Sequence, residues 1–225
     1  MLLKFTVEGE TIGVTPSQVV IAGWTGRDMA AVQHHIDELA AIGVPPPSTV
    51  PLYYRVGAAL VTQADTIDVV GGGSSGEVEP VLVVTGRGLL LTVGSDHTDR
   101  DLEAHSIAFS KQLAGKPIGR HAVRLATVAD VDALELSSQI SDDGESFAVY
   151  QRGTVRAIRP LDELIEGARA ALGGLPEGTI IFCGTVPTTS GEIVPSIHFR
   201  GALRDPATGE TLDVRYAVNR LPVVS

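Results

Sequence analysis

The chain has 225 residues, of which 44% are apolar and 20% are charged, and it carries a formal charge of -10. This is an ordinary globular composition, and the length allows one sizeable core, so we expect a single domain over residues 1–225. Nucleic acids and anionic membrane surfaces are bound through basic patches, and the sequence has no Lys/Arg cluster. A small-molecule partner is therefore favoured over nucleic acid or membrane.

The N-terminal residues reach Glu8 and Glu10 without the uninterrupted apolar stretch of a signal peptide. The longest apolar runs are far shorter than the roughly 20 residues that span a bilayer. The sequence therefore predicts a cytoplasmic protein. Its single cysteine, Cys183, cannot form an internal disulfide and is expected to be a small buried residue.

The first third of the chain predicts two strands and a helix. Residues 2–7 and 18–22 alternate as strands do. From 28 to 42 apolar residues recur every three to four positions, with Asp28 as N-cap and Gly43 as the end of the helix. The proline-rich stretch 44–51 cannot form regular structure, because proline removes donors and biases the preceding residue towards extended geometry.

Strands dominate the rest of the chain. Residues 71–76 form a glycine-rich loop, and the strands 77–84 and 89–93 are expected to pair through a turn at 85–88. Further strands are expected at 52–56, 60–61 and 67–70, and helices at 101–113 and 161–172. Because strands and helices do not alternate regularly, we predict a β-rich α+β fold with a few helices.

Two acids on the strand after the glycine loop suggest a cation site. Glu77 and Glu79 are two residues apart, so their side chains point to the same face of the strand. Adjacent carboxylates resist ionisation unless a cation lies between them, and Mg²⁺ or Mn²⁺ prefers such oxygen ligands. The alternative is a solvent-facing strand edge without a chemical role.

A third oxygen ligand is expected from Asp96, which follows the partner strand of the hairpin and so returns towards the Glu pair. The charges just beyond it have a structural interpretation. Asp99, Arg100 and Asp101 are expected to be the N-cap and first-turn charges of the following helix.

The first helix carries a candidate base. His35 and Glu38 are three residues apart and lie on one helix face, where the carboxylate can raise the basicity of the imidazole. The alternative is a solvated helix face, and His34 is interpreted as a surface residue.

Taken in order, these features resemble the fumarylacetoacetate hydrolase superfamily over about residues 20 to 190. The resemblance rests on Gly23-Trp24-Thr25-Gly26-Arg27-Asp28, His35-x-x-Glu38, Pro51-Leu52-Tyr53-Tyr54-Arg55, Glu77-x-Glu79, Asp96-x-x-x-Arg100-Asp101, Lys111, Pro117-Ile118-Gly119 and Gly184-Thr185. It implies a mixed sandwich or roll as one domain, usually a homodimer.

The resemblance also implies roles for individual residues. Glu77, Glu79 and Asp96 would bind Mg²⁺ or Mn²⁺, and His35 and Glu38 would activate water. Lys111 and Thr185 would line the substrate site, as would Arg55, which stands where many relatives have Lys. Ser95 replaces the Asn that precedes the metal-binding Asp in relatives, so this chain resembles a divergent, compact branch.

The implied function is a metal-dependent hydrolase that cleaves a C–C bond in a small diketo or oxo-acid of the acylpyruvate kind. A decarboxylase, isomerase or hydratase using the same metal is the alternative, because only hydrolysis needs the dyad to deliver water. An alternative of another class is an oxo-acid or metal-binding protein that has lost catalysis.

Overall fold

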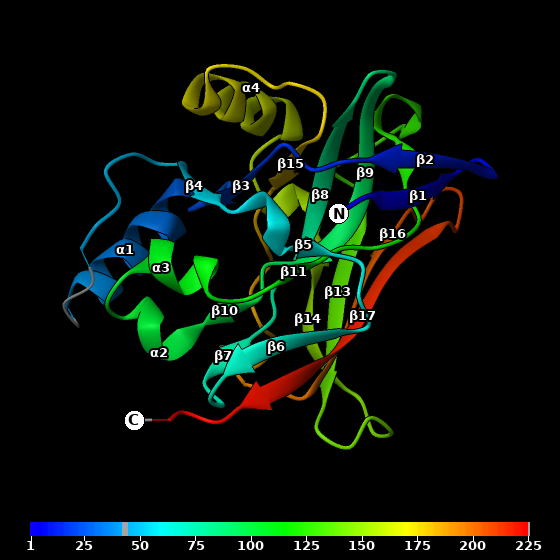
Figure 1. The fold of residues 1–225 in the computed structure, drawn as a ribbon. Helices are drawn as coiled ribbons and strands as arrows, with labels where there is room; N and C mark the ends of the chain where they lie inside the picture. Colours follow the sequence, from blue (N-terminus) through cyan, green and yellow to red (C-terminus); the bar gives the residue numbers. More distant parts are fainter. Residues whose placement is uncertain (42–44, 225) are drawn as a thin grey trace.

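The computed structural model describes residues 1–41 and 45–224. Two large β-sheets form the body of the fold, with three helices gathered at one side and the fourth above (Figure 1). The β-rich α+β fold predicted from the sequence is therefore confirmed. No helix in this part of the chain is long and apolar enough to cross a membrane.

The first sheet has six strands in the order β12-β9-β8-β15-β3-β4. At its centre the apolar run of β8 is buried on both faces. The predicted hairpin is present, since β8 and β9 pair antiparallel from Val78 opposite Ser95 to Thr85 opposite Gly88. The strands are β3 (Gln18–Gly23), β4 (Leu52–Val56), β8 (Val78–Thr85), β9 (Gly88–Ser95), β12 (Val123–Arg124) and β15 (Thr179–Phe182).

The second sheet has five strands in the order β14-β13-β16-β17-β6. Its long strands alternate buried and exposed residues, so one face is in the core and the other faces solvent. Its inward side chains, including Leu136 and Phe199, share one apolar cluster with Leu82 of the first sheet. The strands are β6 (Thr66–Val70), β13 (Glu135–Ser141), β14 (Ala148–Thr154), β16 (His198–Arg204) and β17 (Thr211–Leu221).

Three small strand pairs complete the sheets. The hairpin β1 (Leu3–Val7) with β2 (Glu10–Val14) covers the first sheet, and β5 (Val61–Thr62) pairs in parallel with β11 (Lys116–Pro117). The predicted glycine loop is partly a strand, because β7 (Ser74–Ser75) pairs with β10 (Thr98–Asp99). This pairing ties the loop to the chain that follows β9.

Two helices agree with the sequence prediction. Helix α1 spans Met29–Ala41, and Asp28 caps it by accepting from the N–H groups of Ala30 and Ala31 at 2.9 and 3.2 Å. Its expected end at 42–43 lies outside the described residues. Helix α4 spans Leu161–Leu172 and ends at Gly173, whose φ of 71° is the left-handed conformation that favours glycine.

The prediction of a single helix over 101–113 is wrong. The chain forms two short helices, α2 (Arg100–Glu103) and α3 (Ile107–Gln112). Ser106 adopts an extended conformation between them, and its hydroxyl caps α3 through the N–H of Phe109. A local side-chain cap thus competes with continuation of the helix. Short 3-10 turns also occur at η1 (Ala58–Leu60), η2 (Leu125–Thr127) and η3 (Val155–Ala157).

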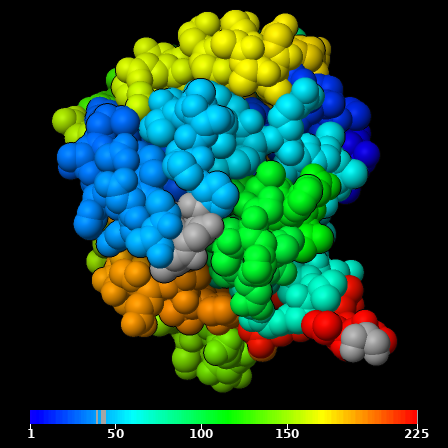
Figure 2. All heavy atoms as spheres, turned by 90° about the vertical axis from the view of Figure 1, so that its left-hand side faces the viewer, coloured from blue at the N-terminus to red at the C-terminus, as the bar shows by residue number. Residues whose placement is uncertain are grey.

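One face of the molecule brings several sequence-distant segments together. Figure 2 shows α1, the chain that leads into β4, and the pair α2–α3 side by side on this face. Prolines 45–47 form no helix or strand, as predicted. Several of the residues expected to carry chemistry lie in the elements that meet here.

Candidate metal centre

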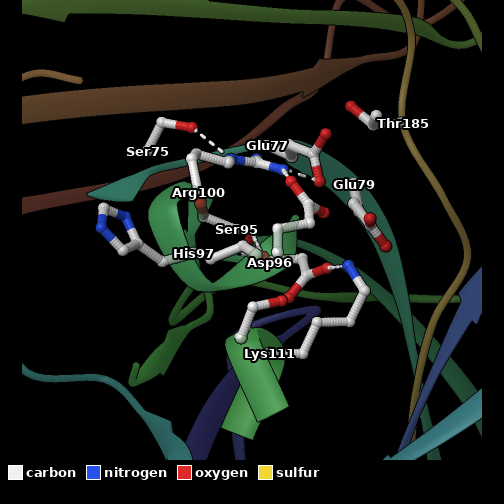
Figure 3. Close-up of polar contacts among 12 residues, drawn as sticks. Ser75, Glu77, Glu79, Ser95, Asp96, His97, Arg100, Lys111 and Thr185 are labelled. Carbon is white, nitrogen blue, oxygen red and sulfur yellow. Dashed lines mark hydrogen bonds and ion pairs between the residues drawn. The ribbon is translucent and has the colours of Figure 1, made fainter. Parts of the chain in front are cut away.

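The hairpin β8–β9 brings the three predicted ligands together. Glu77 and Glu79 lie at the start of β8, and Asp96 directly follows β9 with its N–H donating to the Glu77 carbonyl at 3.0 Å. Oxygen atoms of the three carboxylates all lie within 4.8 Å of one another (Figure 3). The alternative of a solvent-facing strand edge is wrong, because Glu79 and Asp96 are only 2% and 0% exposed.

Among the described residues, Glu79 is the acid of the three that forms no ion pair with a lysine or arginine. Burial raises the pKa of its carboxyl well above the usual value, and the neighbouring carboxylates of Asp96 and Glu77 raise it further. The N–H of Gly184 donates to its Oε2 at 2.8 Å. Gly184 has a φ of 96°, and a Cβ there would meet the Thr25 hydroxyl at 1.8 Å, so only glycine fits this close approach.

Asp96 is held between two ammonium groups. Lys111 from α3 donates to Oδ2, and the Lys116 nitrogen lies 2.9 Å from Oδ1. Burial alone would raise the pKa of Asp96, but the two lysines outweigh it and hold the pKa below its usual value. Asp96 is therefore an ionised carboxylate in the interior of the protein.

Lys116 is a component of the centre that the sequence analysis missed. Its side chain is 0% exposed, and besides Asp96 it contacts the carbonyl of His97, to which its ammonium donates. Burial lowers the pKa of this lysine, while Asp96 opposes the shift. Its neighbour Pro117 belongs to the Pro-x-Gly motif of the resemblance, but the spacing alone gave Lys116 no chemical role.

Arg100 is not the exposed first-turn charge that the sequence predicted. Its side chain is 12% exposed and lies 3.3 Å from Glu77 and 2.8 Å from Glu103. It also donates to the hydroxyl of Ser75 at 2.8 Å. Burial would lower its pKa, but the two glutamates outweigh this and raise it. Asp99 does cap α2, accepting from the N–H of Leu102 at 2.9 Å.

A buried hydrogen-bond chain supports the segment that carries Asp96. His97 points away from the carboxylates (Figure 3), and its ring nitrogens lie 2.8 Å from the Tyr216 hydroxyl and 2.9 Å from that of Ser74. Tyr216 also contacts the Ser95 hydroxyl at 2.8 Å. Burial, together with Lys116 and Arg100, lowers the pKa of His97 to about 3. His97 is thus a neutral structural group, and sequence analysis gave it no role.

Thr185 lies beside the two glutamates (Figure 3). Its hydroxyl donates to the Val78 carbonyl at 2.7 Å and accepts from the Gln151 side-chain amide at 2.7 Å. Gln151 also accepts from the N–H of Val78 at 3.0 Å, so it fixes the start of β8. Gln151 was missed as well, because nothing in its local sequence connects it with Glu77 and Glu79.

The dyad residues lie on an exposed part of α1. The side chains of His35 and Glu38 are 63% and 59% exposed, and Nδ1 of His35 lies 3.6 Å from Oε2 of Glu38. His34, exposed as predicted, lies nearer to Glu38, at 3.2 Å. Among the described residues, neither member of the dyad hydrogen-bonds to the carboxylate cluster.

Two aromatic side chains connect the dyad helix with the cluster. The Trp24 ring lies 5.8 Å from the His35 ring, and its N–H donates to the Tyr54 hydroxyl at 3.1 Å. The ammonium of Lys111 lies 5.8 Å from the centroid of the Tyr54 ring. Trp24 has a φ of 60°, an unusual left-handed conformation for a bulky residue.

Arg55 is not brought to the cluster. It follows Tyr54 on β4, and consecutive residues of a strand point to opposite faces of the sheet. Because Tyr54 faces Lys111, Arg55 points to the other face, and it is exposed. Its role in substrate binding stays a prediction from the sequence. Cys183 is buried, as predicted.

Comparison with solved structures shows the fold. The chain is similar to Cg1458, with 17% identity and a TM-score of 0.65 over 92% of this chain and 77% of that one. It is also similar to 2-keto-3-deoxyarabinonate dehydratase, with 16% identity and a TM-score of 0.65 over 96% and 86% of the two chains. A structure of 2-keto-3-deoxy-D-arabinonate dehydratase complexed with magnesium and 2,5-dioxopentanoate matches with 17% identity and a TM-score of 0.62 over 92% and 75%.

No curated protein matches the sequence. The family model described as "Protein of unknown function (DUF2848)" matches residues 22–216, a range that holds the whole carboxylate cluster and both lysines. The chain therefore belongs to the DUF2848 family.

Proposed function

We propose that this protein is a divalent-metal-dependent enzyme that acts on a small oxo-acid, as a divergent member of the fumarylacetoacetate hydrolase superfamily. The observation that carries the proposal is the convergence of Glu77, Glu79 and Asp96 on neighbouring strand ends. The similarity in fold to a dehydratase whose structure holds magnesium and a dioxo-acid supports it.

The residues fit a hard divalent cation. All three offer carboxylate oxygens, the ligands that Mg²⁺ and Mn²⁺ prefer. The pKa of Glu79 is raised by burial and by the two nearby acids, so a cation between these groups would favour its ionised form. Bound there, Mg²⁺ or Mn²⁺ would supply Lewis-acid stabilisation of the negative charge that develops beside a substrate carbonyl.

The surrounding cations have separable roles. Lys116 holds one oxygen of Asp96 and Arg100 holds Glu77, so both position ligands. Lys111 reaches the other oxygen of Asp96 from α3 and also faces the Tyr54 ring. We assign Lys111 to the substrate carboxylate, with the Thr185 hydroxyl at the opposite side of the glutamates.

Hydrolytic cleavage of a C–C bond is the reaction we propose first. It requires His35 and Glu38 to take a proton from water, with α1 moving nearer to the cluster when substrate binds. Dehydration, decarboxylation or isomerisation is the second candidate, favoured by the exposure of His35 and by the dehydratase named among the structural relatives. We further propose that the enzyme is a cytoplasmic homodimer.

The test combines metal binding with product identification. Titration calorimetry with Mn²⁺ and Mg²⁺ should give one site per chain, and the loaded protein is then incubated with a panel of acylpyruvates and 2-oxo acids. Mass spectrometry of the products distinguishes hydrolysis, which adds water across a C–C bond, from loss of water or CO₂. Absence of stoichiometric metal binding would exclude the proposed function.

A further inference from the structure

Two opposed arginines lie on the solvent face of the five-stranded sheet, away from the carboxylate cluster. On β16 and β17, Arg200 is directly opposite Arg215 in the strand register, and both side chains are exposed on the same face. We propose that this pair binds a small multivalent oxyanion, such as a phosphate or a dicarboxylate. The proposal is independent of the metal centre.

The two arginine side chains carry like charges and repel each other. Like charges directly opposite each other on adjacent strands destabilise a sheet. Among the described residues, neither guanidinium forms an ion pair with a carboxylate. This is notable in a chain of net charge -10, in which acids outnumber the cations that could pair with them.

The next arginine on the same face, Arg204, is paired with an acid. Arg204 lies four residues after Arg200 on β16 and donates to Glu135 of the neighbouring strand at 2.9 Å. Its register partners are Glu135 on one side and Thr211 on the other. The sheet thus pairs Arg204 with an acid across the strands but places Arg200 opposite a second arginine.

Arg200 and Arg215 line an open hollow on this face of the sheet. A cavity of about 310 Å³ is lined by Arg200, Arg215, His198 and Phe147. The Arg200 guanidinium carbon lies 3.5 Å from the centroid of the Phe147 ring, and stacking of this kind leaves the N–H groups at the edge of the guanidinium free to donate. Asp65 also lines the hollow, and its carboxylate lies 3.7 Å from Arg120.

The loop that carries Phe147 is fixed by its own hydrogen bonds. Asp143 accepts from the N–H groups of Glu145 and Ser146 and from the Ser141 hydroxyl, each at 2.8 Å. Gly144, with a φ of 76°, turns the chain at this point and lies against His198. The side of the hollow that carries Phe147 is therefore held in place by hydrogen bonds within its own loop.

These features select the ligand chemistry. Two guanidinium groups with free N–H edges suit an acceptor with several oxygens and a charge near -2, since each fork can bind two oxygens. A phosphate group and a short dicarboxylate share this chemistry. The hollow of about 310 Å³ is large enough to admit a small molecule of this class.

The experiment compares three variants of the full chain. Binding of inorganic phosphate, pyrophosphate and succinate is measured by calorimetry and by thermal unfolding, with NaCl at matched ionic strength as the control for screening. Arg200→Gln and Arg215→Gln should each weaken binding at least about tenfold, the worth of one lost charge-assisted contact. Arg204→Gln, on the same strand and face, should bind as the wild type does.

The direction of the Tm change in anion-free buffer is an independent test. Arg215→Gln should raise Tm in anion-free buffer, because it removes the opposed charge and leaves the stack of Arg200 on Phe147 in place. Arg204→Gln should lower Tm by losing its partner Glu135. The relative affinities for phosphate and succinate identify the source of the anionic group. The proposal is overturned if NaCl reproduces the stabilisation, if Arg204→Gln weakens binding equally, or if sedimentation shows that Arg200→Gln disrupts a dimer through this face.

Discussion

The ammonium nitrogen of Lys116 lies 2.9 Å from Oδ1 of Asp96, and both side chains are completely buried. The loss of hydration of two such charges is costly, and it is offset only while both partners are present. With Lys111 on the other oxygen, the Asp96 carboxylate has a fixed position and a fixed charge. The position of the third acid of the cluster therefore depends on a lysine 20 residues further along the chain.

Replacing Lys116 with Met is expected to destabilise the protein by about 3–5 kcal/mol, because Asp96 would keep a buried charge with one partner fewer. Urea unfolding followed by circular dichroism measures the loss. The double variant Asp96→Asn with Lys116→Met should lose less stability than the sum of the two single losses, because the Lys116–Asp96 pair can be lost only once. Additive losses in the double variant would show that the two residues are not coupled.

Replacing Glu79 with Gln should abolish stoichiometric Mn²⁺ binding and leave the fold intact. The amide has nearly the same shape and removes a charge that burial already disfavours, so unfolding stability should be unchanged or higher. Calorimetry and electron paramagnetic resonance report the metal. Glu103→Gln is the matched control, because Glu103 pairs with Arg100 but does not belong to the cluster, and it should bind Mn²⁺ normally.

Lys111→Ala should raise KM strongly or abolish turnover on the substrate identified by the oxo-acid panel. The reason is the loss of the cation that we assign to the substrate carboxylate. Arg55→Ala serves as the comparison, since Arg55 faces the other side of β4 and is exposed. Steady-state kinetics of both variants should show a large effect for Lys111 and a smaller effect for Arg55. A larger effect of Arg55→Ala than of Lys111→Ala would assign the substrate carboxylate to Arg55.

His35→Ala should lower kcat on the order of 10²- to 10⁴-fold with little loss of metal affinity, the usual worth of a positioned general base. His34→Ala is the control, because His34 lies on the same helix and also contacts Glu38 but is not proposed to take the proton. Full turnover in His35→Ala would remove water activation by the dyad. The dehydratase, decarboxylase or isomerase reaction would then replace hydrolysis.

The carboxyl of Asp143 should titrate at about pH 2, because the N–H groups of Ser146 and Glu145 and the Ser141 hydroxyl lower its pKa. Because the pKa is lower in the folded protein, the ionised carboxylate stabilises the folded loop at pH values above the ordinary carboxyl pKa near 4. This contribution is lost as the pH falls towards 2. Carboxyl ¹³C NMR measures the midpoint. Ser141→Ala removes one donor and should move the midpoint upward; an unchanged midpoint would contradict the role of this hydroxyl.

The sequence by itself determined the features that depend on local spacing. The three-to-four residue period gave α4 over Leu161–Leu172, and Asp28 marked the start of α1. The i, i+2 spacing of Glu77 and Glu79 and the short hairpin to Asp96 predicted the cluster, because strand geometry fixes which side chains share a face. These inferences needed only neighbours along the chain or across one hairpin.

Tertiary structure decided what surrounds the three acids. Tyr216 is 119 residues from His97, and Gln151 is 73 residues from the Val78 N–H that it accepts, so no local pattern could join them. Arg100 looked like a solvated first-turn charge, but it is buried beside Glu77, directly after the strand β10 that pairs with β7. Lys116 is buried because β11 pairs in parallel with β5, a contact that depends on the whole path of the chain. Burial sets the strength of these charges, and burial arises only when distant segments pack together.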